Sequence, residues 1–541
     1  MSGSNRINPK IYSLLRIGAL VAIWLLLTVL FAVAYTQSPL YEGNQNTKFL
    51  HGLAMSGQGN LKADWLANTA DPLPLFTYLV YATALVDERL FYIYYVAIMG
   101  VYVFSVMGIL STLYKEKWTL NKQVVFFALF LWVHARWAIT RIERGYDFNI
   151  EFLQNGVAGQ YLLGIEFQNS AFGVLLLLSI YAFLKKKYYL AALCIGVATL
   201  FHSAYIFSAA LMTIAYLLVI FWDNLKASPA MSERSFSKII RAAKQPFWLG
   251  VFTTILVLPV LWYNQAYLSA TSPQTSAQAL DILVHYRIPH HAVFSSFWDS
   301  KATIQLGIML LGLILAFRSR RLFTVMFSLF AGGLLVSVVQ ILTGNNSLAL
   351  MAPWRVSVLL VPLSVSLIIA FLVSGLIDLL HMNHPKYLLI FAPFALYIIF
   401  INVRGGYTLQ NIYGTGSRER KMVEMMNYVK TNKLPGDIYM IPPTDASFDD
   451  FRLFTGAPIL INWKSHPYKD TEVLEWYARV EASDRFYKAA PAEMCTLLAD
   501  LVGKYPITHV VLKGKEVALS CDFTDEVYRQ TRYVIYTIDR Q

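Results

Sequence analysis

Long apolar runs alternate with polar connections along this chain, and that alternation constrains its fold more than any other feature. A helix needs about 20 mostly apolar residues to cross a bilayer. We expect eleven membrane helices, over 17–37, 90–114, 124–140, 169–184, 188–203, 204–222, 246–265, 302–317, 322–343, 354–376 and 387–403. The first is expected to stay as an anchor, because its apolar run is long and no small-residue cleavage site follows it.

Composition excludes the main soluble classes. Only 14% of the 541 residues are charged and 56% are hydrophobic, whereas an ordinary soluble domain carries about 25% charged residues. The net charge of +12 comes without any dense Lys/Arg cluster, so we expect no nucleic-acid partner. Three cysteines are too few for a disulfide scaffold or a thiolate metal site. The sequence therefore predicts a mainly α, polytopic membrane protein surrounded by membrane lipids.

The distribution of basic residues predicts the orientation of the spans. With the N-terminus in the cytoplasm, 18 Lys and Arg fall in the inner connections and nine in the outer ones, as the positive-inside rule requires. The long connections 38–89, 141–168 and 266–301 then face outward, and such loops often carry function. No eukaryotic retention signal is present, so we expect a bacterial inner membrane with a periplasmic active face.

Composition changes after residue 403. We expect 1–403 to form the transmembrane domain and 404–541 a periplasmic α/β domain. The pattern predicts strands over 436–443, 457–462, 508–512 and 533–538, with helices over 471–480 and 491–503. Cys495 and Cys521 share this domain, and the sequence leaves open whether they form a disulfide or two free thiols. Polar and aromatic residues at 449–452 and 463–470 suit either glycan binding or an interface with the outer loops.

The first outer loop concentrates polar side chains close to the end of the first span. It contains Glu42, Asn44, Gln45, Asn46, Asp64 and Asp71. Residues 73–86 are apolar but too short to cross, so we expect a helix lying along the membrane surface. Partial desolvation there raises a carboxyl pKa toward neutrality, which suits a general base. Each acid alone would equally suit a helix cap or a solvated surface.

This loop pattern resembles that of the GT-C glycosyltransferases. The resemblance rests on an acid at the outward end of the first span, Asp64 before Trp65, a Pro-bounded interfacial helix, evenly spaced spans and an outward mixed domain. It implies an enzyme that takes a sugar from a polyprenyl-phosphate carrier and passes it to a glycan, lipid or protein acceptor. It also implies that Glu42 is the catalytic acid and that Asp64 is a second polar position.

The sequence departs from that family at one point. Family members often carry two adjacent acids or an Asp-x-Asp motif, whereas Gly43 and Asn44 follow Glu42 here. The choice of base between Glu42 and Asp64, and the need for a divalent metal ion such as Mg²⁺ or Mn²⁺, therefore stay open.

The other two outer loops add candidate ligands. Glu166 and Gln168 precede a span that begins at Asn169 or Ser170, and a helix N-terminus favours anions such as a lipid phosphate. His202 occupies a tight outward turn, where a plain turn residue is the alternative.

The third outer loop is rich in cationic and imidazole side chains. Arg287, His290 and His291 could contact a phosphate or a sugar hydroxyl, or the two His could bind a metal together with a first-loop carboxylate. Arg355 lies at the outer start of an apolar span. An ionisable residue there predicts phosphate binding, with snorkelling toward lipid headgroups as the alternative.

Three functions fit this organisation. The first is a glycosyltransferase in which Glu42 or Asp64 deprotonates an acceptor hydroxyl, Arg355 stabilises the departing polyprenyl phosphate, and one displacement inverts the anomeric centre. The second is an oligosaccharide polymerase or ligase on the same scaffold, with a diphosphate-linked glycan donor. The third is a transporter or flippase, which predicts ionisable groups at mid-membrane depth and matched halves. The sequence shows neither feature, so transport ranks last.

Overall fold

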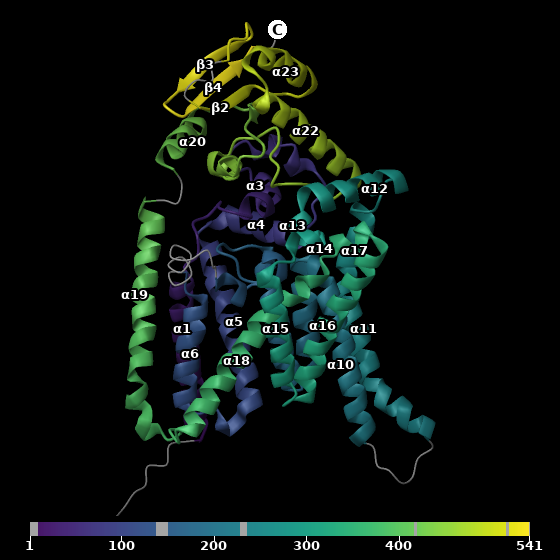
Figure 1. Cartoon of the computed structure of the whole chain (residues 1–541), viewed down its shortest axis with the longest axis vertical. Coiled ribbons are helices and arrows are strands. Elements are labelled where there is room, and N and C mark those ends of the chain that lie inside the picture. Colours follow the sequence, from purple (N-terminus) through teal and green to yellow (C-terminus); the bar gives the residue numbers. More distant parts are fainter. Residues whose placement is uncertain (1–8, 137–149, 228–234, 416–418, 515–518, 540–541) are drawn as a thin grey trace, which may run out of the picture.

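The computed structural model describes residues 9–136, 150–227, 235–415, 419–514 and 519–539. The outer connection 141–168 is described from residue 150 onward, so 141–149 lie outside the described residues, as do 137–140 of the span expected at 124–140. The described chain forms a helical bundle with a mixed sheet and several short helices over one end of it (Figure 1).

Each of the eleven expected spans corresponds to a helix. These are α1 (Pro9–Tyr35), α5 (Leu90–Tyr114), α6 (Leu120–His134), α8 (Val174–Leu184), α9 (Tyr188–Phe201), α10 (Ile206–Ala227), α11 (Ser235–Tyr267), α15 (Ser300–Ala316), α16 (Arg320–Thr343), α18 (Ser357–Leu379) and α19 (Ala392–Thr415). Seven helices in the described residues are long and apolar enough to cross a membrane. The multi-pass prediction is therefore confirmed, and the helices near 120–134, 169–184, 188–201 and 300–316 are shorter.

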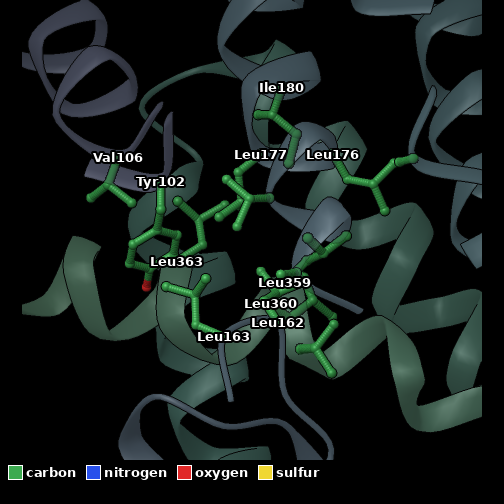
Figure 2. Packing of buried hydrophobic residues seen from close by; sticks show 14 of the residues in the cluster. Tyr102, Val106, Leu162, Leu163, Leu176, Leu177, Ile180, Leu359, Leu360 and Leu363 are labelled. Carbon is green, nitrogen blue, oxygen red and sulfur yellow. The ribbon is translucent and has the colours of Figure 1, made fainter. Parts of the chain in front are cut away.

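Helix α18 lies at the centre of the bundle. It packs against α15, α6, α5 and α16, and its leucines meet side chains of α5, α8 and the 162–163 segment (Figure 2). Figure 2 shows this layer, formed by Tyr102, Val106, Leu162, Leu163, Leu176, Leu177, Ile180, Leu359, Leu360 and Leu363. Large side chains on the outside of the bundle remain exposed, including Leu342 (81%) and Trp262 (64%). Such an apolar surface is unfavourable in water and is expected of a protein that faces lipid.

Short helices form the layer between the bundle and the sheet. They are α2 (Gln45–Lys48), α3 (Leu50–Met55), α4 (Pro74–Val86), α12 (Pro273–Asp281), α13 (Pro289–Ala292), α14 (Phe294–Phe297) and α17 (Asn346–Leu350). Helix α4 coincides with the segment expected to lie along the membrane surface. All seven come from the first and third outer loops or from the residues before α18, so these three parts of the sequence meet at one end of the molecule (Figure 1).

The C-terminal region contains a four-stranded mixed sheet in the order β1-β2-β4-β3. Its elements are α20 (Arg420–Asn432), β1 (Tyr439–Met440), α21 (Phe451–Thr455), α22 (Asp470–Lys488), α23 (Pro491–Lys504), β2 (His509–Lys513), β3 (Thr524–Arg529) and β4 (Tyr533–Ile538). Strand β1 is parallel to β2, and β4 is antiparallel to β2 and β3. Cys495 and Cys521 form a disulfide.

Three details differ from the sequence prediction. Helix α19 continues to Thr415 instead of ending at residue 403. The segment 457–462 makes one isolated parallel bridge, Tyr439 to Ile459, instead of a strand. Strand β3 was not predicted, because it is an edge strand with mostly exposed, polar residues and therefore lacks an apolar face.

Candidate functional site

Two cavities meet the short helix α2 at its two ends, and a residue of the C-terminal region lines each of them. We name them by one residue each. The Glu166 cavity has a volume of about 300 Å³, and Asn44, Glu151, Tyr161, Glu166 and Lys464 are among its lining residues. The Lys48 cavity has a volume of about 350 Å³ and is lined by Lys48, His202, Tyr468 and several apolar side chains. Asn44 and Lys48 are four residues apart, about one helical turn, so a single turn of chain contributes to both cavities.

A tight turn after α1 places the backbone directly over Glu166. Tyr41 and Gly43 both have left-handed φ angles, 68° and 58°. The backbone N–H of Asn44 donates to Glu166 Oε1 at 2.9 Å. A Cβ atom at Gly43 would lie 2.7 Å from the same oxygen, so only glycine fits there without moving the carboxylate.

Glu166 is an acid held away from water. Glu166 is 3% exposed. Burial raises the pKa of its carboxyl, and the neighbouring charge of Glu42 raises it further, whereas the Asn44 N–H and Lys464 lower it. Glu42 is itself buried, at 9% exposure, and lies beside the cavity next to Gly43. The two carboxylates therefore act on each other electrostatically, which is typical of a proton-transfer site.

The amide side chains near these acids hold the loop in place. Gln45 accepts from the Tyr41 N–H (2.7 Å) and donates to the carbonyl of Phe167 (2.9 Å). Gln168 and Asn44 both donate to the Tyr161 hydroxyl, at 3.0 and 2.8 Å. Their hydrogen bonds join the first outer loop to the second, so these amides support the site.

The Lys48 cavity combines a cation, Lys48, with apolar walls. Lys48 lies 5.6 Å from the ring centre of Tyr468. The positive charge of Lys48 lowers the pKa of Tyr468, and Arg287 and Arg355 lower it further. The charges of three cations from three different segments therefore act on one hydroxyl. The remaining wall includes Leu268, Leu280, Leu350 and Met351.

Arg355 is positioned through His202. Its Nη1 donates to His202 Nε2 at 2.9 Å, and His202 Nδ1 lies 2.8 Å from the Asn169 amide. Because Arg can only donate, Nε2 must accept and the proton must be on Nδ1. In the structure Asn169 Nδ2 faces Nδ1, so the Asn169 side chain must turn its amide oxygen toward that proton in order to accept it. His202 is therefore neutral, and it holds the guanidinium without neutralising its charge.

Arg287 is positioned in a similar way against the C-terminal region. Its guanidinium stacks 4.4 Å from the Trp463 ring centre, and Nη2 donates to the carbonyl of Lys464 at 2.5 Å. The Nε atoms of Arg287 and Arg355 are buried and have no hydrogen-bond partner in the described residues. Buried donors normally have partners, so each of these two N–H groups can take an acceptor that the described residues do not supply.

His290 and His291 lie with their rings 4.1 Å apart. Burial lowers the pKa of His291 to about 3, and His290 and Arg355 contribute to the decrease, so this imidazole is neutral near pH 7. Among the described residues, His, Cys, Asp and Glu side chains do not gather in any group of three that could hold a metal ion. The described residues thus show no such group for the Mg²⁺ or Mn²⁺ ion whose requirement the sequence leaves open.

Asp64 lies in a different environment from Glu42 and Glu166. It is fully buried, and Oδ2 lies 2.9 Å from Arg452 Nε in an ion pair. The backbone N–H groups of Ile459 and Leu66 also donate to its carboxylate, each at 3.0 Å. Asp64 thus joins the first outer loop to the C-terminal region.

Asp71 likewise has a local structural contact. Its Oδ1 accepts from the Leu73 N–H at 2.9 Å, and the carbonyl of Asp71 accepts from the Tyr263 hydroxyl at 2.8 Å. It lines only a small cavity of about 20 Å³. The Asp71 side chain is therefore engaged at the start of α4.

The sequence did not single out several residues of the two cavities. Lys48, Tyr161 and Glu151 lie in the first and second outer loops, and Tyr468 lies within the segment 463–470. Lys48 follows Asn44 by one helical turn, and that spacing is the signal that would have found it. Tyr161 and Tyr468 carry no such signal, because their roles depend on contacts between distant segments.

Comparisons with known proteins give a partial likeness. A family model described as a domain of unknown function (DUF6798) matches residues 420–483, and no curated protein matches this chain. The chain resembles the crystal structure of the Archaeoglobus fulgidus oligosaccharyltransferase in its apo form, with a TM-score of 0.45 and 12% identity over 92% of this chain and 69% of that one.

Two further structures of the archaeal oligosaccharyltransferase from that organism are similar. The complex with an inhibitory peptide and a dolichol-phosphate gives a TM-score of 0.44, with 12% identity over 91% of this chain and 69% of that one. The complex with Zn and sulfate gives a TM-score of 0.41, with 12% identity over 91% of this chain and 68% of that one. All three likenesses combine 12% identity with a TM-score of 0.41 to 0.45. They carry no argument about reaction, substrate or acceptor.

Proposed function

We propose that this protein is a membrane glycosyltransferase that transfers a sugar from a polyprenyl-phosphate-linked donor to an acceptor at the outer face of the membrane. The observation that carries the proposal is the position of Lys48, 5.6 Å from the Tyr468 ring, together with the lowering of the Tyr468 pKa by the charges of Lys48, Arg287 and Arg355. In the described residues, neither arginine has a carboxylate within salt-bridge distance, and both keep an unsatisfied Nε–H. Cations without a carboxylate of the described residues in salt-bridge contact are suited to a phosphate.

The donor fits the Lys48 cavity because the two parts of its wall match the two parts of a lipid phosphate. The cationic part would hold the phosphate. The apolar part, including Leu268 and Met351, would receive the first isoprenoid units near the outer ends of α11 and α18. A soluble sugar phosphate would gain nothing from this apolar wall.

The acids of the Glu166 cavity would perform the proton transfer. An acceptor hydroxyl loses its proton to a carboxylate and attacks the anomeric carbon, and a new glycosidic C–O bond forms. The bond between the anomeric carbon and the carrier phosphate breaks, and the phosphate leaves with the electron pair toward the cations. One displacement inverts the anomeric centre.

Glu166 is the favoured base, because it lines the cavity and has a raised pKa. Glu42 retains the position that the family resemblance gives to the catalytic acid and acts on Glu166 through its charge. Asp64 is engaged by Arg452, and we therefore propose a structural role for it.

The proposed orientation places both cavities and the C-terminal region outside the cytoplasm, in the periplasm of a bacterial cell. The excess of basic residues in the opposite connections supports this orientation. The disulfide Cys495–Cys521 lies at the same end of the molecule as the cavities, and disulfides persist in oxidising compartments.

A reconstituted assay tests the proposal. The full-length protein in proteoliposomes would receive undecaprenyl-phosphoryl hexoses or undecaprenyl-diphosphate glycans, with a membrane extract as acceptor source. Release of free undecaprenyl phosphate that depends on Glu166 supports a monophosphate donor. Release of undecaprenyl diphosphate instead identifies the polymerase or ligase alternative. Release of neither carrier lipid from these donors contradicts the proposal.

A further inference from the structure

A third cavity, of about 300 Å³, adjoins the Glu166 cavity. We name it the His290 cavity. Its lining includes His290, Phe297, Asp299 and Lys301 from the third outer loop and the start of α15. Glu151 and Asn155 line both this cavity and the Glu166 cavity, so the two spaces share one wall. None of the proposed functional steps uses the His290 cavity.

The shared wall is held in a fixed position. Gln305 Nε2 donates to the carbonyls of Phe152, Asn155 and Gly156, at 2.8, 2.9 and 3.2 Å. On the opposite side, Asp299 Oδ1 accepts from the Ala302 N–H at 2.8 Å and caps α15. The cavity is therefore preformed, which reduces the entropy that a ligand must lose on binding.

The charge of the His290 cavity differs from that of the Lys48 cavity. Its described lining holds two carboxylates, Glu151 and Asp299, against one cation, Lys301. Burial lowers the pKa of His290, and Arg287 lowers it further, so His290 is neutral near pH 7. The described lining thus offers acidic, basic and neutral polar groups together, whereas the charged residue in the lining of the Lys48 cavity is Lys48.

The lining has the chemistry that a polyhydroxylated ring needs. Carboxylates accept hydrogen bonds from hydroxyls, the ammonium and amide groups donate them, and the imidazole does one of each. Phe297 is half-buried, and it offers an aromatic surface for the C–H face of a sugar. The volume lies at the lower end of the range for ligand pockets, about 300–1,000 Å³, which suits one or two rings.

We infer that the His290 cavity binds a neutral carbohydrate ring of the acceptor, whose hydroxyl reaches the Glu166 cavity past Glu151 and Asn155. The acceptor is then a glycan. This inference rests on the proposed function for the direction of transfer, but the carbohydrate site itself rests on the cavity alone.

Two neighbouring serines provide a matched pair for the test. Ser295 and Ser296 are both exposed and both belong to α14, but only Ser296 lines the cavity. The probes are methyl α-D-glucopyranoside, galactopyranoside and mannopyranoside, and the readout is saturation-transfer NMR on the full-length protein in nanodiscs. We expect at least one probe to bind, S296W to reduce binding at least about tenfold, and S295W to leave it within about twofold.

Each result decides one of the two claims. Equal binding by S295W and S296W, or no binding of any probe to the native protein, overturns the carbohydrate site.

Undecaprenyl phosphate binding, measured in parallel by native mass spectrometry, is expected to be the same in both variants. If native protein binds a glycoside but not undecaprenyl phosphate, the proposed function fails and the carbohydrate site stands. If S296W melts at a lower temperature, H290Q replaces it, with the same expected loss of probe binding.

Discussion

The first outer loop contains two regions with similar residues and opposite environments. Around Glu42, Asn44 and Lys48, the chain lines two cavities. Around Asp64, the carboxylate is fully buried and satisfied by Arg452 and two backbone N–H groups. The difference teaches that the group paired with an acid beside the membrane surface decides its role. An acid in an ion pair holds two parts of the fold together, whereas an acid at a cavity can take part in catalysis.

The cations repeat this contrast. Arg452 is 2% exposed and faces the Asp64 carboxylate. Arg287 and Arg355 contact aromatic, carbonyl and imidazole groups instead. A buried ion pair stabilises a contact only while both partners remain, whereas a guanidinium held by neutral groups keeps its charge for a ligand.

The largest expected effect concerns the cavity region. E166Q keeps the shape and the acceptor for the Asn44 N–H but cannot take a proton, so we expect turnover to fall about 10²- to 10⁴-fold. The measurement is the initial rate of undecaprenyl phosphate release in proteoliposomes. E42Q serves as the comparison. Full activity of E166Q together with an inactive E42Q would reverse the proposed roles of the two acids.

The next prediction tests the Asp64 region. D64N leaves Arg452 buried without a counter-charge, and breaking a buried pair costs about 3–5 kcal/mol. We expect a lower melting temperature and faster proteolysis of the C-terminal region. D71N is the control, and it should stay within about 1 kcal/mol, because Asp71 is only half-buried. If D64N is fully stable but loses all transfer activity, Asp64 has a catalytic role and not the structural role proposed here.

A smaller effect is expected on donor affinity. K48M and R355M each remove one charged hydrogen-bond donor, worth about 1.5–3 kcal/mol, so the Kd for undecaprenyl phosphate should rise about 10- to 150-fold. The exposed Lys62 supplies the control K62M, whose Kd should not change. Titration in nanodiscs measures all three. An equal weakening by K62M would show that general surface charge, not the Lys48 cavity, attracts the lipid.

The smallest effect is a pH dependence of stability. Because burial raises the pKa of Glu166, the native state favours the protonated acid. The contribution of protonated Glu166 to the free energy of unfolding is fully present below the ordinary carboxyl pKa of about 4.3. It is lost as pH rises through the raised pKa of the folded state. Native protein should therefore lose stability relative to E166Q over that interval. Melting temperatures of both forms from pH 4 to 8 measure this, and a gap independent of pH would contradict it.

Periodicity and composition predicted the parts of the fold that depend on local pattern. The eleven apolar runs all correspond to helices, and helices 471–480 and 491–503 match α22 and α23. The predicted lengths of these helices were less accurate, because the residues at which α6 and α19 end depend on contacts with neighbouring helices. The segments 449–452 and 463–470 do contact the outer loops, as Arg452 and Trp463 show.

The candidate site was only partly accessible to sequence reasoning. Glu166, Arg287, His202 and Arg355 were singled out by their types and positions, and the structure brings them close to the two cavities. The separation of Asp64 from Glu42 could not be predicted, since it depends on Arg452, which lies 388 positions further along the chain. Contacts of that range leave no periodic signal.

The most direct test of the central claim is a cryo-EM map of the full-length protein in nanodiscs with undecaprenyl phosphate. The account predicts phosphate density in the Lys48 cavity, within hydrogen-bond distance of Lys48 or Arg355, with the lipid chain along Leu268 and Met351. An empty cavity at saturating lipid, or phosphate density at another place on the bundle, would contradict it.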